Sequence, residues 1–314
     1  MAVNAFIFPG QGSQVVGMGR DLAAAFAPAR EVFEEVDEVL KQKLSRLMFE
    51  GPAEELTLTE NAQPALMAMS MAVLRVLESE GGFDLARAGR LVAGHSLGEY
   101  SALAAAGTFS LADAARLLRI RGRAMQQAMP AGSGAMAALL GADFEQAVAI
   151  AADAAQGEVC TAANDNAPAQ VVVSGHRGAV ERAVALAAER GVRRAVMLPV
   201  SAPFHSPLMI PAAEAMAEAL AGTSMAPPCL PVVANVTAMP TSDPAEIRAL
   251  LVRQVTGTVR WREGVLKMRA EGIDSLVELG AGQVLTGLAR RIDKDLAAVA
   301  VGNPAGIEAF LKML

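Results

Sequence analysis

The chain has 314 residues and is 53% hydrophobic, yet it contains only one tryptophan and one tyrosine. This length can bury a large core, and a composition rich in Ala, Leu, Val and Met suits helices packed against buried parallel strands. The formal net charge is −6. We therefore expect no nucleic-acid partner, because proteins that bind nucleic acid carry basic surfaces.

Several prolines interrupt the long uncharged stretches at residues 196–213 and 219–242, so we expect no membrane-spanning helix and no membrane partner. The first residues lack the basic and long apolar regions of a secretory signal. Cys160 and Cys229 match no metal-ligand spacing, and we expect both to be buried small residues. These features predict a cytoplasmic protein without a metal site or cofactor, and we expect a monomer.

The first predicted strand covers residues 5–8 and leads into a loop with glycines at 10, 12, 17 and 19. A dinucleotide-binding module would need G-x-G-x-x-G and an acidic residue about twenty positions later. The spacing here differs, which argues against nucleotide binding. The loop can instead bring backbone N–H groups, including that of Gln11, close to a neighbouring loop, or it can be a plain turn.

Helices are predicted over residues 20–47, followed by a loop at 56–65 that leads into an apolar helix ending at Leu77. Residues 91–100 then read LVAGHSLGEY. A G-x-S-x-G pattern between a strand and a helix is typical of a nucleophilic serine on a sharp turn, which makes Ser96 the candidate nucleophile. The alternative is a serine that only caps the following helix.

A helix predicted over residues 111–129 carries four arginines, at 116, 119, 121 and 123. Their spacing alone favours the interpretation that they lie on a solvent-exposed face of the helix. One of them aimed into a pocket would instead bind a substrate carboxylate through two parallel hydrogen bonds.

Residues 136–198 follow the order β-α-β-β-α-β, which is typical of a ferredoxin-like unit. Alternating strands and helices flank this insertion, with strands predicted at 232–236 and 275–279, and such alternation predicts a mostly parallel sheet. We expect an α/β fold with two parts. Residues 1–128 and 200–314 form a discontinuous catalytic core, and residues 129–199 form a small inserted subdomain.

Three histidines could activate a serine. His95 adjoins Ser96 and more plausibly packs, since neighbours on a sharp turn point apart, and His176 lies in a predicted surface turn. His205 lies in a loop stiffened by Pro199, Pro203 and Pro207, so we favour it as the general base over a purely structural role. No acidic residue between Ser96 and His205 ends a predicted core strand, which argues against a generic esterase.

Several motifs together resemble the malonyl-CoA:acyl-carrier-protein transacylases of bacterial fatty acid synthesis. The motifs span nearly the whole chain in the order of that family: FPGQGSQ at 8–14, GHSLGEYSAL at 94–103, Arg121-Gly122 with Met125-Gln126, Asn166-x-Pro168-x-Gln170, SAPFHS at 201–206, LVRQ at 251–254 and GAGQVLTGL at 280–288. The resemblance implies an α/β-hydrolase-like core with a ferredoxin-like insertion.

The resemblance also implies a role for each matching residue. Ser96 would carry the acyl group and His205 would act as base and then as acid. The backbone carbonyl of Gln254 would hold the second nitrogen of His205, which accounts for the missing carboxylate. Backbone N–H groups of Gln11 and Leu97 would form the oxyanion hole.

By the same resemblance, Arg121 would bind the malonyl carboxylate, with Gln11, Phe204 and Asn166 also in the substrate site. The reaction would be ping-pong, from malonyl-CoA to Ser96 and then to the phosphopantetheine thiol of holo acyl carrier protein. Because carrier proteins of this family are acidic, we expect a basic patch at the cleft mouth, formed by Arg193, Arg194, Arg290 and Arg291. A serine hydrolase or thioesterase and an acyltransferase of a polyketide pathway remain alternatives.

Overall fold

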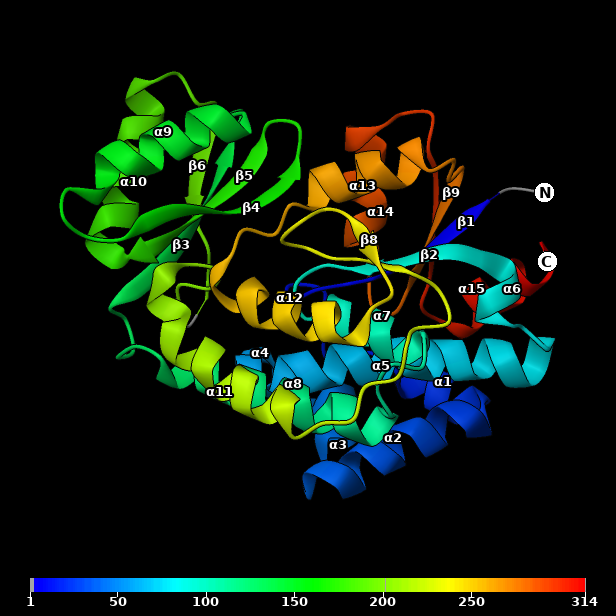
Figure 1. The fold of residues 1–314 in the computed structure, drawn as a ribbon. Coiled ribbons are helices and arrows are strands. Elements are labelled where there is room, and N and C mark those ends of the chain that lie inside the picture. Colours follow the sequence, from blue (N-terminus) through cyan, green and yellow to red (C-terminus); the bar gives the residue numbers. More distant parts are fainter. Residues whose placement is uncertain (1–2, 201, 314) are drawn as a thin grey trace.

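The computed structural model describes residues 3–200 and 202–313, so Ser201 of the SAPFHS motif lies outside the described residues. The described residues form two β-sheets, one larger and one smaller (Figure 1). The larger sheet has the strand order β10-β9-β1-β2-β7-β8 and is parallel except for the pairing of β7 with β8. Its strands are β1 (Asn4–Phe8), β2 (Gly89–Gly94), β7 (Val232–Val233), β8 (Pro240–Thr241), β9 (Ser275–Leu279) and β10 (Ala297–Val301).

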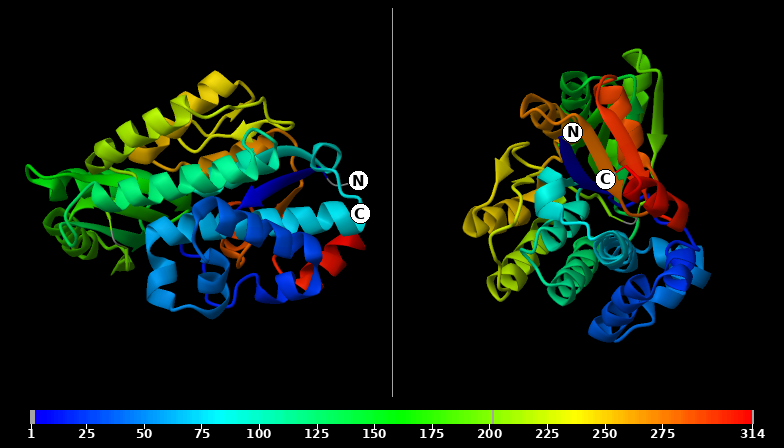
Figure 2. Two further views of the ribbon diagram at one scale, coloured as in Figure 1. Left: turned by 90° about the horizontal axis from the view of Figure 1, so that it is seen from below. Right: turned by 90° about the vertical axis from the view of Figure 1, so that its right-hand side faces the viewer.

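Helices cover both faces of the larger sheet, as Figures 1 and 2 show. Alternate side chains of β1 divide between two cores, because successive residues of a strand point to opposite faces. Phe6 and Phe8 pack with the core that includes α5 and α8, whereas Ala5 and Ile7 pack with α13 and α14. The helices of this part are α1 (Arg20–Ala25), α2 (Ala27–Leu40), α3 (Leu44–Glu50), α4 (Ala53–Thr57), α5 (Thr59–Gly81), α6 (Leu85–Ala88), α7 (Gly98–Ala105), α8 (Leu111–Gln127), α11 (Ile210–Ala221), α12 (Pro244–Thr256), α13 (Trp261–Ala270), α14 (Val284–Ile292) and α15 (Pro304–Leu311).

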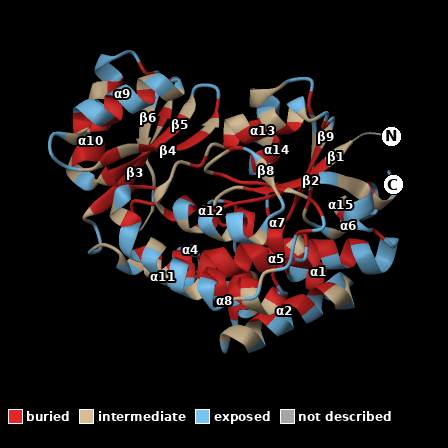
Figure 3. Cartoon of the chain, in the orientation of Figure 1, coloured by how far each residue is buried: buried red, intermediate tan, exposed pale blue. Residues whose placement is uncertain are grey.

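The smaller sheet is antiparallel and has the order β4-β5-β3-β6. Its elements follow the predicted β-α-β-β-α-β order: β3 (Gly134–Leu140), α9 (Phe144–Ala155), β4 (Cys160–Ala167), β5 (Gln170–His176), α10 (Arg177–Glu189) and β6 (Arg194–Met197). One face packs on α9 and α10 to form a core of its own, with many of its residues buried (Figure 3). Met136 and Val172 point from the other face into a cavity between the sheets.

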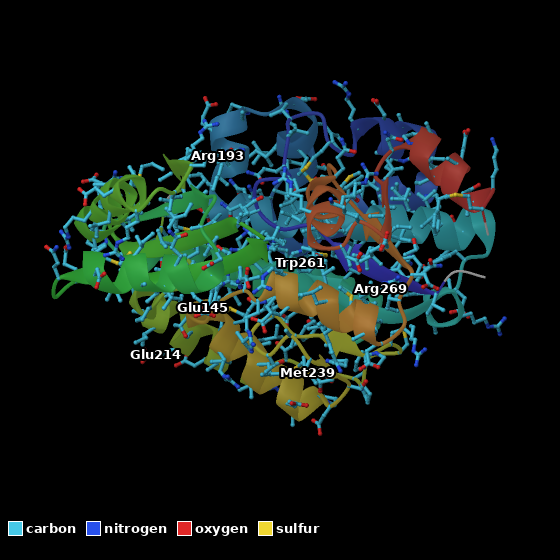
Figure 4. The ribbon with its side chains drawn as sticks, turned by 90° about the horizontal axis from the view of Figure 1, so that it is seen from above. Glu145, Arg193, Glu214, Met239, Trp261 and Arg269 are labelled. Atoms are coloured by element: carbon cyan, nitrogen blue, oxygen red, sulfur yellow. The ribbon has the colours of Figure 1, made fainter. Side chains whose placement is uncertain are left out.

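Strand β4 joins the two parts of the molecule. Asn164 pairs with Val259, and the backbone N–H of Asp165 donates to the Val259 carbonyl at 2.9 Å. The Asp165 carboxylate is buried and accepts two hydrogen bonds from Arg262 Nε, both at 3.0 Å. Arg262 follows Trp261 at the start of α13, beside the small sheet (Figure 4). This junction fixes β4 against the core.

The structure corrects several expectations. The loop expected at 56–65 is helical from Thr59, and Pro64 lies within α5. A proline near a helix start removes only one hydrogen bond, and the surrounding residues of α5, from Asn61 to Leu74, are all buried. The strand expected at 232–236 ends at Val233, because the chain turns at Ala234, whose N–H donates to the Met239 carbonyl. No expected element covers β10 or α15.

Cys160 is buried, but Cys229 is exposed, so the expectation for Cys229 was wrong. It lies on the irregular surface segment between α11 and β7, where neither sheet covers it. Within the described ranges, no helix combines the length and the apolar character that crossing a bilayer requires.

Candidate active site

Ser96 lies at the tip of the turn between β2 and α7, with a φ of 54°. A non-glycine residue in this left-handed region is strained, which is common at functional sites. The turn is held at both backbone groups of the serine. Its N–H donates to Asn235 Oδ1 at 2.7 Å, and its carbonyl accepts from Gln254 Nε2 at 2.9 Å.

The two glycines of the G-x-S-x-G pattern allow this turn to form. A Cβ on Gly94 would lie 1.9 Å from the carbonyl carbon of Gly98, and a Cβ on Gly98 would lie 2.2 Å from the Phe8 carbonyl oxygen. Both distances are far below a van der Waals contact. The bare backbone therefore lets the serine turn approach the loop that follows β1.

His205 contacts the serine directly. Its Nε2 lies 2.7 Å from Ser96 Oγ, and its Nδ1 lies 2.8 Å from the Gln254 carbonyl oxygen. A carbonyl can only accept, so Nδ1 carries the proton and Nε2 is left as the acceptor for the serine hydroxyl. Burial, and then the nearby Arg121 charge, lower the pKa of His205 to about 3. The imidazole is therefore neutral at pH 7 and able to accept a proton.

Arg121 is the only one of the four arginines of α8 that lines the cavity among the described residues. Its side chain donates to three neutral groups: Gln63 Oε1 and Gln254 Oε1, both at 2.8 Å, and Ser96 Oγ at 3.2 Å. Burial lowers its pKa, but an arginine remains charged at pH 7. The described part of the chain gives it no ion pair. It is a buried cation available to an anionic substrate group.

Two residues that line the cavity have backbone N–H groups without a partner in the described structure. Gln11 follows β1 and Leu97 follows Ser96; neither N–H donates a hydrogen bond within residues 3–200 and 202–313. The two loops are in contact, since a Cβ on Gly10 would lie 2.6 Å from the His95 carbonyl oxygen. The side chain of Gln11 is held by Thr59, whose Oγ1 donates to Gln11 Oε1 at 2.8 Å.

These groups surround a cavity of about 470 Å³ between the two sheets. Phe204 and Asn166 also line it. The side chain of Asn166 contacts His95, with its Oδ1 2.7 Å from His95 Nε2. His95 also packs near Trp261, so it has structural contacts and does not touch the Ser96 hydroxyl among the described atoms. His176 is half-buried, and its Nδ1 accepts from the Val159 N–H.

Three residues near the site were not singled out from the sequence. Gln63 holds Arg121, and Asn235 holds the Ser96 N–H. Glu99 is buried beside the nucleophile and accepts from Asn235 N at 3.0 Å and Gln254 Nε2 at 2.9 Å. Burial raises the pKa of Glu99 to about 7, although these hydrogen bonds oppose the rise. Only its place in the first turn after the serine could have pointed to it.

The arrangement brings together a serine hydroxyl, a neutral imidazole held in one tautomer, two backbone N–H groups without a partner in the described structure and a buried guanidinium. Nucleophile, base and donors are the groups that acyl transfer through a covalent ester requires. A buried guanidinium beside these groups is suited to an acyl group that carries a negative charge. Within the described ranges, no cluster of His, Cys, Asp and Glu could hold a metal ion.

Comparison with known proteins supports this class. The family model described as an acyl transferase domain matches residues 5–302. The malonyl CoA-acyl carrier protein transacylase of Escherichia coli (strain K12) is 46% identical over 313 residues, which are 100% of both chains. The Bacillus subtilis (strain 168) protein of the same name is 45% identical over 315 residues, covering 100% of this chain and 98% of its own.

Solved structures agree. An acyl-carrier-protein-S-malonyltransferase from Bartonella henselae superposes with a TM-score of 0.97 at 56% identity, covering 99% of both chains. A malonyl-transacylase in complex with its type II PKS acyl-carrier protein superposes with a TM-score of 0.96 at 43% identity, covering 100% of both. The fold and the site are thus those of an acyltransferase. The chain belongs to the malonyl CoA-acyl carrier protein transacylase family.

Proposed function

We propose that this enzyme transfers the malonyl group of malonyl-CoA to the phosphopantetheine thiol of holo acyl carrier protein in fatty acid biosynthesis. The reaction is ping-pong and passes through a malonyl ester of Ser96. The observation that carries this proposal is the contact of Ser96 Oγ with both His205 Nε2 at 2.7 Å and Arg121 Nη2 at 3.2 Å. These two hydrogen bonds place the proposed nucleophile next to a base and next to a cation.

In the first half-reaction, His205 Nε2 takes the hydroxyl proton while Ser96 Oγ attacks the thioester carbonyl. The N–H groups of Gln11 and Leu97 stabilise the oxyanion. When the intermediate collapses, the C–S bond breaks, and the CoA sulfur takes the proton from His205. The Gln254 carbonyl keeps the imidazole in the required tautomer throughout.

Arg121 selects the acyl group by pairing with the malonyl carboxylate inside the cavity. A buried bidentate pair of this kind is strong because the site excludes water. Phe204 and Asn166 both line this cavity, and Phe204 would limit the space beside the carbon between the two carbonyls. We propose that Arg121 makes the enzyme select malonyl over acetyl groups, and that Phe204 makes it select malonyl over branched extender groups.

In the second half-reaction, the carrier thiol gives its proton to His205, and the carrier sulfur attacks the carbonyl of the Ser96 ester. When the bond to Ser96 Oγ breaks, His205 returns the proton to Ser96. A hydrolase would use water at this step. The four exposed arginines 193, 194, 290 and 291 are placed to receive an acidic carrier. In the small sheet, Arg194 lies in register with Leu140 and Leu140 with Gln170, and Arg291 Nη1 contacts the Gln170 side chain. These contacts bring Arg194 and Arg291 toward the same end of the small sheet, and we propose that Arg193 and Arg290, their neighbours in the sequence, extend the patch.

We further propose that residues 1–128 and 200–314 form the catalytic core and residues 129–199 a subdomain that closes the cavity, and that the enzyme is a cytoplasmic monomer. The sheets support the division: among the described residues no strand belongs to both, and β4 reaches the core through the pairing of Asn164 with Val259, which lies between α12 and α13.

The acylation step is tested by intact mass spectrometry of the protein after mixing with malonyl-CoA, with peptide mapping of the modified residue. We expect one malonyl adduct, on Ser96, and none on the Ser96→Ala variant. An unmodified wild-type protein, or an adduct that persists in Ser96→Ala, would refute the nucleophile assignment.

A further inference from the structure

Glu99 and Arg121 are an acidic and a basic side chain that are both buried, each 1% exposed, but they form no ion pair with each other in the described structure. The direct partners of the Arg121 guanidinium are neutral. Burying a charge without a charged partner is costly. Neutral hydrogen-bond acceptors must therefore hold the Arg121 guanidinium, which stays charged and can bind an anionic substrate.

The side-chain amide of Gln254 connects the two charged groups. Its Oε1 accepts from Arg121 Nη2 at 2.8 Å, and its Nε2 donates to Glu99 Oε2 at 2.9 Å and to the Ser96 carbonyl at 2.9 Å. Turning the amide over would set its NH2 against the guanidinium donors and its oxygen against two acceptors. The orientation shown satisfies every contact only while Glu99 accepts a hydrogen bond.

Glu99 also supports the nucleophile turn. The same oxygen that accepts from Gln254 accepts from the backbone N–H of Asn235 at 3.0 Å. Asn235 in turn accepts the Ser96 N–H on its Oδ1 and donates from Nδ2 to the Gly94 carbonyl at 2.7 Å. One buried carboxylate thus orders the groups around both Ser96 and Arg121.

We propose that Glu99 is a positioning and specificity residue that acts on Arg121 through the Gln254 amide, and thereby favours acyl groups bearing a carboxylate. The inference rests on the proposed function, in which Arg121 binds the malonyl carboxylate. By accepting from Nε2, the Glu99 oxygen holds the Gln254 amide with its own oxygen turned toward the guanidinium. Because the amide separates the charges, Arg121 keeps its charge for the substrate, whereas a carboxylate in direct contact would compete with it.

The test compares rates of Ser96 acylation by malonyl-CoA and by acetyl-CoA in wild type, Glu99→Ala, Glu99→Gln and Arg121→Ala. In Glu99→Ala we expect the malonyl KM to rise at least about tenfold while acetyl loading changes far less, because an oriented bond to a charged group is lost. Glu99→Gln presents an oxygen to the same two donors, so we expect it to restore the malonyl-to-acetyl ratio to within about threefold.

Glu278 provides a matched control. It is also a buried glutamate, and it accepts the backbone N–H groups of Leu285 and Thr286 at 3.1 and 2.7 Å, away from the cavity. Glu278→Ala should lower the melting temperature without changing the malonyl-to-acetyl ratio. If Glu99→Ala does not fold, Glu99→Asp takes its place. Its side chain is one methylene shorter, so its carboxylate no longer reaches Gln254, and we expect the malonyl-to-acetyl ratio to fall.

Two results would overturn the inference in distinguishable ways. If Arg121→Ala lowers the ratio but Glu99→Ala, or Glu99→Asp in its place, reduces both acylation rates equally, Glu99 has only a structural role and the clamp stands. If Arg121→Ala leaves the ratio unchanged, the clamp of the proposed function fails and the inference fails with it.

Discussion

The backbone carbonyl of Gln254 orients His205, and it takes the place of the carboxylate in a hydrolase triad. A carbonyl fixes the tautomer equally well but adds no negative charge beside the imidazole. Together with burial and the positive charge of Arg121, this keeps the pKa of His205 far below that of an ordinary histidine. The base is therefore ready without prior loss of a proton.

This difference predicts the pH dependence of acylation. An ordinary histidine with a pKa of about 6.5 gains a proton as the pH falls from 8 to 5 and then cannot act as a base. Because the pKa of His205 is about 3, we expect kcat/KM for malonyl-CoA to show no acid limb near pH 6.5. The profile is measured by rapid quench in wild type and in Glu99→Gln, which removes the other buried group that titrates in this range. An acid limb near pH 6.5 in both proteins would contradict the account.

At the same scale, the sequence indicates the residues whose chemistry is visible in a motif. Ser96 could be recognised from its strand-turn-helix context, and His205 from its proline-stiffened loop. Arg121 could not be separated from Arg116, Arg119 and Arg123 by spacing. Only the fold shows that it lines the cavity, because the position of the helix relative to other elements decides which arginine faces it.

Among the elements, the contact between the serine turn and the loop after β1 depends on Gly98. A methyl group there would collide with the Phe8 carbonyl oxygen and move the loop that carries Gln11. Loss of one oxyanion donor costs about 10²- to 10³-fold in kcat. We expect Gly98→Ala to lower the acylation rate by about 100-fold.

The control for this prediction is Gly287→Ala, in helix α14, where an added Cβ meets no atom within 4 Å. Its acylation rate should match wild type in the same single-turnover assay. Wild-type activity in Gly98→Ala would show that the two loops do not need to approach so closely.

The junction between the sheets depends on Asp165 and Arg262. Asp165 is 1% exposed, and removing its partner leaves a buried, unpaired carboxylate. We expect Arg262→Ala to reduce the free energy of unfolding by about 3 kcal/mol. Arg46→Ala, which breaks an exposed pair with Glu50, should cost less than about 1 kcal/mol. Urea denaturation measures both, and equal losses would exclude a special role for the junction.

Element boundaries show where local sequence stops being sufficient. The predicted limits of β9, residues 275–279, agree with the structure because this apolar run has a turn at each end. The strand expected at 232–236 was too long, because Asn235 serves the serine turn in place of the sheet ladder. That partner is 139 positions away along the chain, so no local pattern reveals it.

For the whole molecule, an acidic protein must meet an acidic carrier through a local basic surface. Electrostatic complementarity changes association more than chemistry at the buried site. We expect the double variant Arg193→Glu, Arg194→Glu to raise KM for the carrier protein about tenfold and to leave acylation by malonyl-CoA unchanged. Arg46→Glu with Arg116→Glu makes the same change in net charge elsewhere, and it should affect neither step. Equal losses in both half-reactions would refute the patch.

The α/β class and the β-α-β-β-α-β order of the smaller sheet follow from alternating patterns along the chain, and they could be predicted. The placement of the cavity between the sheets could not, because it depends on how β4 pairs with Val259 across the junction. Met136 and Val172 have the same apolar character as their neighbours, and only the packing shows which face they line.

In the proposed reaction, the malonyl group on Ser96 is transferred to the thiol of the carrier protein. The most direct measurement isolates the malonyl-enzyme, divides it between buffer and holo acyl carrier protein, and follows both products by mass spectrometry. The account predicts that the ester persists in buffer and is discharged rapidly, with the malonyl group recovered on the carrier. Release of free malonate at the same rate with and without the carrier would contradict it and identify a hydrolase.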